Sequence, residues 1–315
     1  TLTSVSRRKR QQALDTKPAL PRPNVFLLVT MLVWAYNFSA VKLMSKEASA
    51  PSMVLARSVL MMGIIVVVGW YSGAYRLKLT LKQRWMLWAQ GLLSNGLYMI
   101  AFLYGMRGTT AAMGAIILAT VPLQVALLSV FLKHSKVEKN LFVGAGIAFA
   151  GVILAEISLA SSSTGVTWWG NALVFLGAIC WAVAVILMRP LSEAIGPIPA
   201  FVHSFPAAFL VLIPLGLTDL VRVDFASWTL SETLNFFHFS LLSGGLGFFT
   251  YYKGLSQVGT VKGVMYQFIV APMAGVMAWM ALGTPLTPGL VGGLLLVLSG
   301  VYWALFAKRP QASNQ

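Results

Sequence analysis

Aromatic and amide side chains recur at helical spacing inside the most apolar stretches of this sequence. Asn95, Tyr98 and Phe102 follow an i, i+3, i+7 pattern, which places them on one face of a helix. Rings and amides together offer stacking surface and hydrogen bonds, the chemistry that holds a solute with an apolar body and polar groups. The candidate substrate-binding residues are Trp34, Tyr36, Asn37, Asn95, Tyr98, Gln124, Trp181, Phe248, Tyr251, Tyr266 and Gln267.

Motifs of catalysis are missing from the sequence. It contains no HExxH, no GxxxxGK and no paired carboxylates within an apolar stretch. His134, His203 and His238 fall at different expected depths, which disfavours a metal site. The single Cys180 cannot form an internal disulfide. We therefore expect neither an enzyme nor a cofactor or metal centre.

The elements that carry the candidate residues must lie in lipid. The 315 residues are 58% hydrophobic and only 10% charged, which leaves too little polar surface for a soluble protein. A membrane-spanning helix needs about 20 apolar residues. Ten stretches meet this requirement: 24–43, 50–71, 85–106, 109–132, 140–158, 168–188, 198–217, 235–257, 260–282 and 287–307.

The net charge of +15 is distributed unevenly between the loops. Lys and Arg concentrate in the tail 1–23, in the loops after the second and fourth spans, and in the tail 308–315. The loops after the fifth and ninth spans carry no charge. The positive-inside rule therefore places both termini in the cytoplasm, which requires an even number of spans. This topology signal accounts for the basic residues, so we expect no nucleic-acid partner.

Two segments of the chain are copies of one another. "LLSNGLYMIAFLYGM" (92–106) and "LLSGGLGFFTYYKGL" (241–255) start 149 residues apart and share six of fifteen positions. The same separation aligns 141–152 with 290–301, whose glycines favour helix packing. Residues 24–158 and 168–307 are therefore predicted to be two five-helix repeats. Because five is odd, the second repeat is inverted, an arrangement typical of secondary transporters.

The order of these motifs resembles the drug/metabolite transporter superfamily, EamA type. The likeness spans residues 24–307 and rests on Arg57, on "GTTAAMGAIILATVPLQVALLSVFL" and on "VKGVMYQFIVAPMAGVMAWMALG". The span endings "GAGIAFAGVIL" and "GGLLLVLSGVY" extend it. The resemblance implies a ten-helix transporter with a cavity lined mainly by the first, third, fourth, sixth, eighth and ninth spans.

Three ionisable residues and two prolines have two interpretations each. Arg57 either bonds backbone carbonyls or contacts substrate, because a charge within a span needs a partner. His203 is either a packed, hydrogen-bonded residue or a group that takes up and releases a proton during transport. Lys253 either extends to the lipid headgroups or contributes its charge to transport. Pro122 and Pro272 are either hinges or static kinks.

These observations predict an all-α, multi-pass protein of the plasma (bacterial inner) membrane, monomeric or weakly dimeric. Its predicted function is secondary transport of a small amphipathic or zwitterionic, amino-acid-like metabolite by alternating access, as exporter, facilitator or exchanger. Glu156, the one acid within a predicted span, lies near the outer end of the fifth span. Without a midplane carboxylate we expect diffusion or exchange and not proton coupling. The alternative is a lipid scramblase or flippase-like protein.

Overall fold

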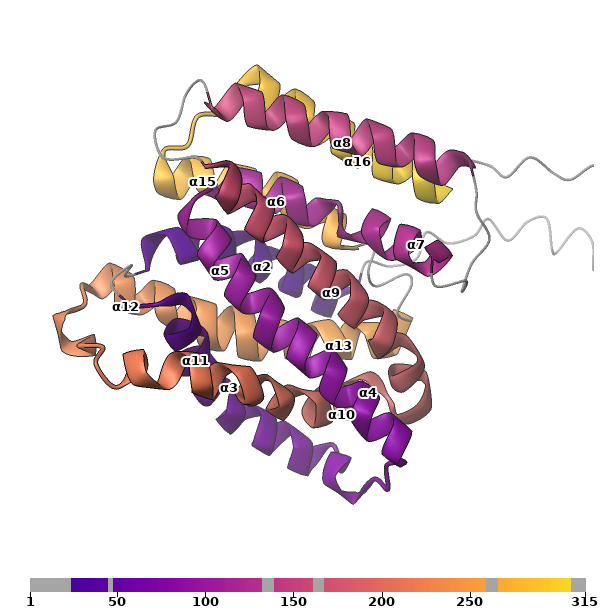
Figure 1. The fold of residues 1–315 in the computed structure, drawn as a ribbon, viewed down its shortest axis with the longest axis vertical. Helices are drawn as coiled ribbons and strands as arrows, with labels where there is room; N and C mark the ends of the chain where they lie inside the picture. The colour runs from indigo at the N-terminus through magenta and orange to yellow at the C-terminus, as the bar shows by residue number, and fades with distance from the viewer. Residues whose placement is uncertain (1–23, 45–47, 132–138, 161–166, 259–265, 307–315) are drawn as a thin grey trace, which may run out of the picture.

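The computed structural model describes residues 24–44, 48–131, 139–160, 167–258 and 266–306, and within these ranges the regular elements are all helical (Figure 1). The first half comprises α2 (Val25–Leu43), α3 (Ala50–Tyr71), η1 (Ala74–Arg76), α4 (Leu81–Gly91), η2 (Leu92–Leu97), α5 (Tyr98–Arg107), α6 (Ala111–Ala119), α7 (Val121–Phe131) and α8 (Lys139–Ala160). The second half comprises α9 (Trp168–Ile195), α10 (Pro197–Ser204), η3 (Phe205–Ala208), α11 (Phe209–Leu220), η4 (Phe225–Ser227), α12 (Leu230–Phe237), η5 (His238–Leu246), α13 (Gly247–Val258), η6 (Tyr266–Ile269), α15 (Val270–Leu282) and α16 (Pro288–Phe306). Each predicted span contains one or more of these helices.

The helices have the length and surface of a membrane bundle. Five described segments are long and apolar enough to cross a bilayer: Val25–Leu43, Ala50–Tyr71, Leu81–Arg107, Trp168–Ile195 and Pro197–Leu220. Large apolar side chains are exposed on the outer surface, among them Val66, Val67, Leu210, Ile213 and Leu295. Exposed apolar surface on this scale fits a lipid solvent.

The duplicated sequence has the same unusual backbone in both halves. Residues 92–97 of the first copy and 238–246 of the second are π-helical, and the "LLSNGL" and "LLSGGL" stretches both lie within these segments. A π segment is rare and concentrates at functional sites, because its i→i+5 register re-aims the side chains that follow it. In each half the π segment directly precedes candidate residues, Tyr98 on α5 and Phe248 on α13.

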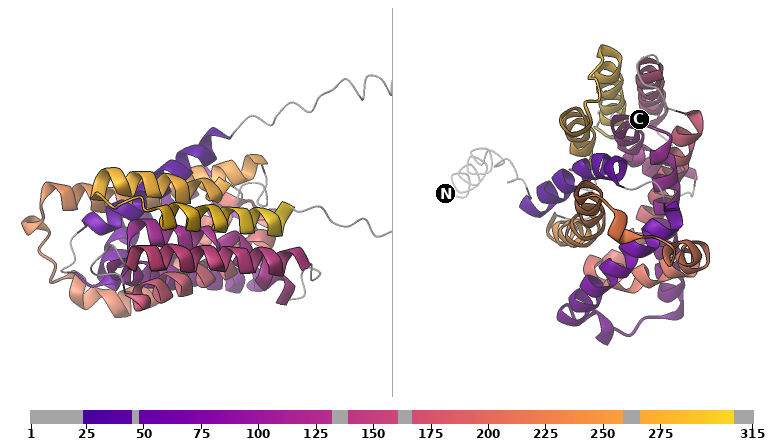
Figure 2. Two further views of the ribbon diagram at one scale, coloured as in Figure 1. Left: turned by 90° about the horizontal axis from the view of Figure 1, so that it is seen from above. Right: turned by 90° about the vertical axis from the view of Figure 1, so that its left-hand side faces the viewer.

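Contacts between α8 and α16 reveal the symmetry of the two halves (Figures 1 and 2). A methyl group on Gly151 would lie 2.6 Å from the carbonyl oxygen of Gly293, and one on Gly300 would lie 2.6 Å from that of Gly144. The repeat alignment exchanges these two contacts, as a two-fold axis requires. Since the partner numbering falls as the α8 numbering rises, the helices are antiparallel and the axis is perpendicular to them. The repeats are thus inverted, and the glycine faces pack helices as predicted.

The fourth and ninth spans are interrupted near their prolines. The fourth span divides at Thr120 into α6 and α7, with Pro122 in the first turn of α7. Pro272 lies in the first turn of α15, directly after the 3-10 turn η6. A proline in the first turn of a helix removes an N–H that has no intrahelical acceptor anyway. Each proline therefore marks the start of a new helix, at matching places in the two repeats.

Several helix boundaries extend beyond the predicted spans because of local capping. The third span starts at Leu81, since the Thr80 hydroxyl accepts from Gln83 N at 3.3 Å and the Gln83 side chain accepts from Thr80 N at 2.9 Å. The sixth span continues to Ile195 and ends at Gly196, whose φ of +88° is a backbone conformation that favours glycine.

Candidate functional site

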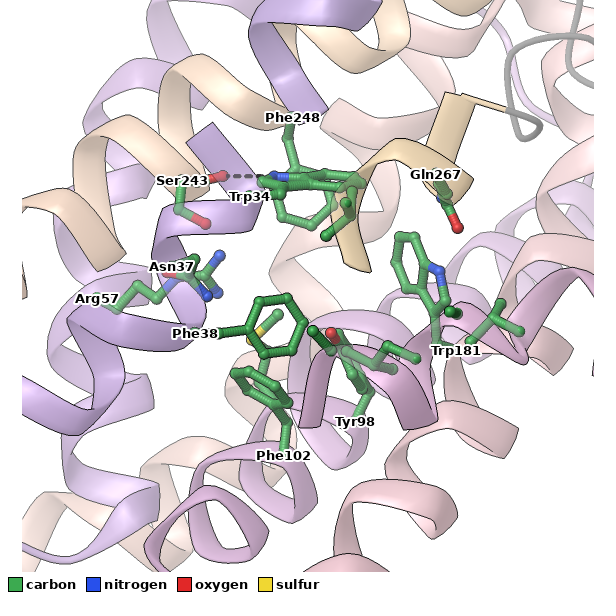
Figure 3. Close-up of a pocket in the computed structure, with 16 residues that line it drawn as sticks. Trp34, Asn37, Phe38, Arg57, Tyr98, Phe102, Trp181, Ser243, Phe248 and Gln267 are labelled. Carbon is green, nitrogen blue, oxygen red and sulfur yellow. Dashed lines mark hydrogen bonds between the residues drawn. The ribbon is translucent and has the colours of Figure 1, made fainter. Parts of the chain in front are cut away.

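A central cavity of about 630 Å³, a volume that includes its open mouth, lies between the two halves (Figure 3). Side chains from both repeats line it: Trp34, Asn37, Phe38, Arg57, Tyr98, Met99, Phe102, Ala115, Leu118, Ala119, Val121, Trp181, Ser243, Phe248, Gln267 and Val270. All six spans implied by the family resemblance contribute to this lining. The second span adds Arg57.

Aromatic rings form much of the cavity wall. The Trp34 ring lies 5.3 Å from Phe248 and 6.3 Å from Trp181, measured between ring centroids, and Tyr98 lies 5.5 Å from Trp181. The edge-to-face and tilted arrangements among these rings are favourable for aromatic pairs. The cluster joins α2 and α5 of the first half to α9 and α13 of the second. It therefore places an apolar wall where the halves meet.

The π segment η5 supplies backbone acceptors to this wall. Trp34 Nε1 donates to the Ser243 carbonyl at 3.1 Å (Figure 3), and Arg57 Nε donates to the Phe239 carbonyl at 2.9 Å. Both acceptors belong to η5, and being four residues apart they lie on one face of it. The π segment η5 thus holds two cavity side chains from the opposite half through its main chain.

Glycines beside these bonds leave room for the side chains. A methyl group on Gly247 would lie 2.7 Å from Trp34 Nε1. One on Gly244 would lie 2.5 Å from Met61 Sδ and 3.2 Å from Arg57 Nε. Real Cβ atoms essentially never approach a neighbour more closely than 3.0 Å. Gly247 is therefore required for the close approach of Trp34 to the helix backbone, whereas a methyl group on Gly244 would displace the Met61 side chain and crowd Arg57.

One end of the cavity is polar and charged. Arg57 is 1% exposed, and its Cζ lies 4.7 Å from the centroid of the Phe239 ring. Its Nη1 atom is buried without a hydrogen-bond partner among the described residues, and so is the Oδ1 atom of Asn37. Figure 3 shows Arg57, Asn37 and Ser243 on one side of the cavity and Trp181 and Gln267 on the other.

The charge of Arg57 is only partly compensated. Within the described part of the chain, the ion pair is Arg189 with Glu193, so no described carboxylate lies within 4 Å of Arg57. A carbonyl bond to a charged donor contributes about 1.5–3 kcal/mol and a desolvated cation–π contact about 2 kcal/mol. Burying a lone charge costs several kcal/mol even after relaxation. Arg57 thus bonds a backbone carbonyl, as one of its two interpretations predicted, and it also lines the cavity, whereas contact with substrate stays a prediction.

Of the candidate binding residues, Trp34, Asn37, Tyr98, Trp181, Phe248 and Gln267 line the cavity together. Tyr251 lies immediately behind them, because its hydroxyl accepts from Gln267 Nε2 at 3.1 Å and its ring is 4.9 Å from Trp34. Gln124 lies one turn beyond Val121, and its Nε2 donates to Thr120 Oγ1 at 2.9 Å.

Three other candidates lie outside the cavity lining. Tyr36 donates to Asn235 Oδ1 at 3.1 Å, and Asn95, within η2, donates to Ser94 Oγ at 2.8 Å. The Tyr266 hydroxyl accepts from the backbone N–H of Asn24 at 3.0 Å. The contacts of Tyr36 and Tyr266 link segments around the cavity, whereas the Asn95 bond is local to η2.

The structure also places His203 and Lys253 away from the lining. His203 Nε2 lies 2.9 Å from the Ala74 carbonyl oxygen, which links α10 to η1. Lys253 is partly exposed midway along α13. The side chain of Glu156 lies outside the described part of the structure.

Some lining residues were not among the sequence candidates. Phe102 shares the helix face of Tyr98, so its spacing was a usable signal. Phe38 and Met99 are ordinary apolar residues of a span and carry no such signal. Ser243 contributes through its backbone carbonyl, which no residue type reveals.

An inverted pair of helical halves around a shared central cavity defines a membrane transporter. Comparison with known proteins agrees: the EamA-like transporter family matches residues 22–157 and again 168–306, and the chain belongs to this family. The resemblance identified from the sequence is confirmed.

Relatives of known sequence are described as transporters. The uncharacterized transporter YetK of Bacillus subtilis is 26% identical over 235 residues, covering 73% of this chain and 71% of its own length. An uncharacterized transporter of Archaeoglobus fulgidus is 24% identical over 290 residues, covering 89% and 96%. A solved crystal structure superposes with a TM-score of 0.60 at 15% identity, covering 90% of this chain and 96% of the other, which supports the fold alone. Family and relatives point to a transporter and not to an enzyme.

Proposed function

We propose that the protein is a secondary transporter of the plasma (bacterial inner) membrane that moves a small amphipathic or zwitterionic, amino-acid-like metabolite. The observation that carries the proposal is the cavity shared by both halves, with aromatic walls and one polar end. Such a cavity matches a solute that has an apolar body and a hydrogen-bonding head. Transport then proceeds by alternating access, as the inverted halves exchange roles.

Uptake into proteoliposomes tests this proposal. A panel of labelled metabolites is offered to the purified protein, and transport of at least one small amphipathic solute is expected. Tyr98→Ala and Asn37→Ala remove a ring and an amide from the lining, and each is expected to lower the uptake rate about tenfold. Tyr104→Ala is the matched control, because Tyr104 is on the same helix but 40% exposed and outside the lining. Equal losses in Tyr98→Ala and Tyr104→Ala would contradict a role for this cavity.

The same vesicles distinguish transport from lipid scrambling. A scramblase moves fluorescent lipid between leaflets and is indifferent to Tyr98→Ala, whereas a transporter moves a water-soluble solute. Lipid movement without solute movement would overturn the proposal.

Coupling is proposed to be facilitated diffusion or exchange. Substrate preloaded inside the vesicles is expected to accelerate uptake, because in an exchanger the change back to the outward-open state is faster with substrate bound. An imposed pH gradient alone is expected to drive little accumulation, since no midplane carboxylate carries a proton. Accumulation driven by protons alone would contradict this coupling.

The proposed orientation has both termini in the cytoplasm, and the protein acts as a monomer or weak homodimer. Reporter fusions at Ser162 and at Lys136 should label opposite sides of the membrane, because the fifth span separates them. Labelling on the same side would refute the orientation.

A further inference from the structure

We propose that Arg57 anchors a carboxylate of the transported solute, so that the substrate combines a carboxylate head with an aromatic or other apolar body. The inference rests on the transport function proposed above and narrows its substrate class. Amphipaths without a carboxylate are then poor substrates.

Arg57 has the free bonding capacity that a carboxylate requires. Its Nε atom is occupied by the Phe239 carbonyl at 2.9 Å, whereas Nη1 is buried without a partner among the described residues. Arg57 is one of the residues that line the cavity (Figure 3), so its guanidinium lies next to the space that a solute would occupy. Guanidinium and carboxylate form short, charge-assisted hydrogen bonds, the strongest kind available to a neutral-pH metabolite.

The charge balance favours a single negative charge. Arg57 is the one charged residue among the lining residues of the described structure. A carboxylate neutralises it, whereas a phosphate dianion would leave a net negative charge buried in the cavity. A solute without a carboxylate would leave the guanidinium without a counter-charge.

Asn37 extends this subsite to a zwitterionic head. Its Oδ1 atom is buried without a partner and lies on the same side of the cavity as Arg57 (Figure 3). An unpaired acceptor near an unpaired cation fits a head group in which an ammonium stands next to a carboxylate. The rings of Trp34, Trp181 and Phe248 then enclose the body.

Four compounds with one phenyl body test the head group directly: phenylalanine, 3-phenylpropionate, phenylalaninamide and phenethylamine. Their dissociation constants are measured with purified protein, and their transport with proteoliposomes. In the unmodified protein the two carboxylates should bind at least about tenfold more tightly than the amide and the amine. This factor corresponds to the loss of one charged hydrogen bond.

Variants separate an anchor from a merely structural arginine. Arg57→Gln should abolish the preference for carboxylates while changing the affinity for phenylalaninamide less than about threefold, and Arg57→Lys should retain part of the preference. Arg107→Gln is the matched control, because Arg107 donates to the Ala48 carbonyl and does not line the cavity. It should keep the full preference. A structural role alone would change stability without changing the ratio between head groups.

Each outcome decides the matter. Equal binding of all four compounds by the unmodified protein, no binding of any, or an undiminished preference in Arg57→Gln overturns the anchor. If Arg57→Gln fails to fold, the head-group ratio of the unmodified protein and of Arg57→Lys still decides. Transport of an amine or amide as fast as a carboxylate would leave the transport function standing and remove only the anchor. Failure of the whole labelled metabolite panel would remove both.

Discussion

Gly247 makes the contact between α2 and α13 directly testable. A methyl group at this position would lie 2.7 Å from Trp34 Nε1 and 3.2 Å from the Leu242 carbonyl oxygen. The backbone oxygen is held by its helix, so the indole must move. The indole N–H donates to the Ser243 carbonyl at 3.1 Å, and this bond breaks when the ring is displaced. Gly247→Ala should therefore disturb the cavity wall.

The expected size of the effect follows from three contributions. Overpacking a close contact costs about 1–3 kcal/mol. Losing the indole hydrogen bond costs about 0.5–1.5 kcal/mol. Replacing glycine by alanine within a helix stabilises the helix by about 1 kcal/mol. Gly247→Ala should thus be less stable by about 0.5–3.5 kcal/mol. Its solute affinity should fall about tenfold, because the displaced Trp34 ring no longer packs against Trp181 and Phe248.

Unfolding of the detergent-purified protein and solute binding measure the two effects. Gly63→Ala is the control, because nothing lies within 4 Å of a methyl group there. It should be neutral or stabilising. The double variant Gly247→Ala, Trp34→Phe should recover part of the lost stability, since phenylalanine lacks the clashing Nε1 edge. If Gly247→Ala is as stable as Gly63→Ala, or if Trp34→Phe brings no recovery, the proposed clash is refuted.

Two further predictions concern the scaffold. Gly293→Ala should destabilise the protein by several kcal/mol, because its methyl group would lie 2.5 Å from the Gly151 carbonyl oxygen. Gly292→Ala is the control and should be tolerated, since its nearest neighbour is a Leu154 methyl group at 3.5 Å. Equal unfolding temperatures of the two variants would contradict this packing. The double variant Pro122→Ala, Pro272→Ala should slow transport about tenfold while leaving solute affinity unchanged if the interruptions bend during access, and an unchanged transport rate would leave them as static kinks.

Features with a compositional signature were predictable from the sequence. The length of the apolar stretches predicted membrane-spanning helices. The repeated glycines of 141–152 and 290–301 predicted a helix-packing face, because close helix approach requires small residues. The aromatic and amide residues marked six lining positions, since such groups are costly in lipid and must face protein or a cavity. These inferences need only the chemistry of the residue and the period of the helix.

Features that depend on backbone register or on distant partners were not predictable. The duplication of 92–97 and 241–246 marked a shared function but not a π-helix, because an i→i+5 register has no characteristic composition. The partner of Arg57 is a carbonyl 182 residues away, and every residue has a carbonyl. Tyr36 and Asn95 resembled lining residues by type and depth. Their hydrogen bonds to Asn235 and Ser94 show that polar side chains within a span can also bond to neighbouring scaffold residues, although the Asn95 Oδ1 atom stays buried without a partner among the described residues.

The cavity's chemistry is less symmetric than its scaffold. Trp34 and Trp181 are 147 residues apart in the two repeats, and the same separation pairs Arg57 with Ser204. Ser204 is fully buried, and its hydroxyl donates to the Phe201 carbonyl at 3.0 Å within its own helix, so its one donor is not free for a carboxylate. When the two halves exchange conformations during alternating access, the backbone arrangement is inverted. The positive charge of Arg57 nevertheless stays on α3, because the second half has no matching charge at Ser204. Ser204→Ala should therefore leave the carboxylate preference intact where Arg57→Gln removes it, and an equal loss in both variants would show that the head group is held by the two halves together.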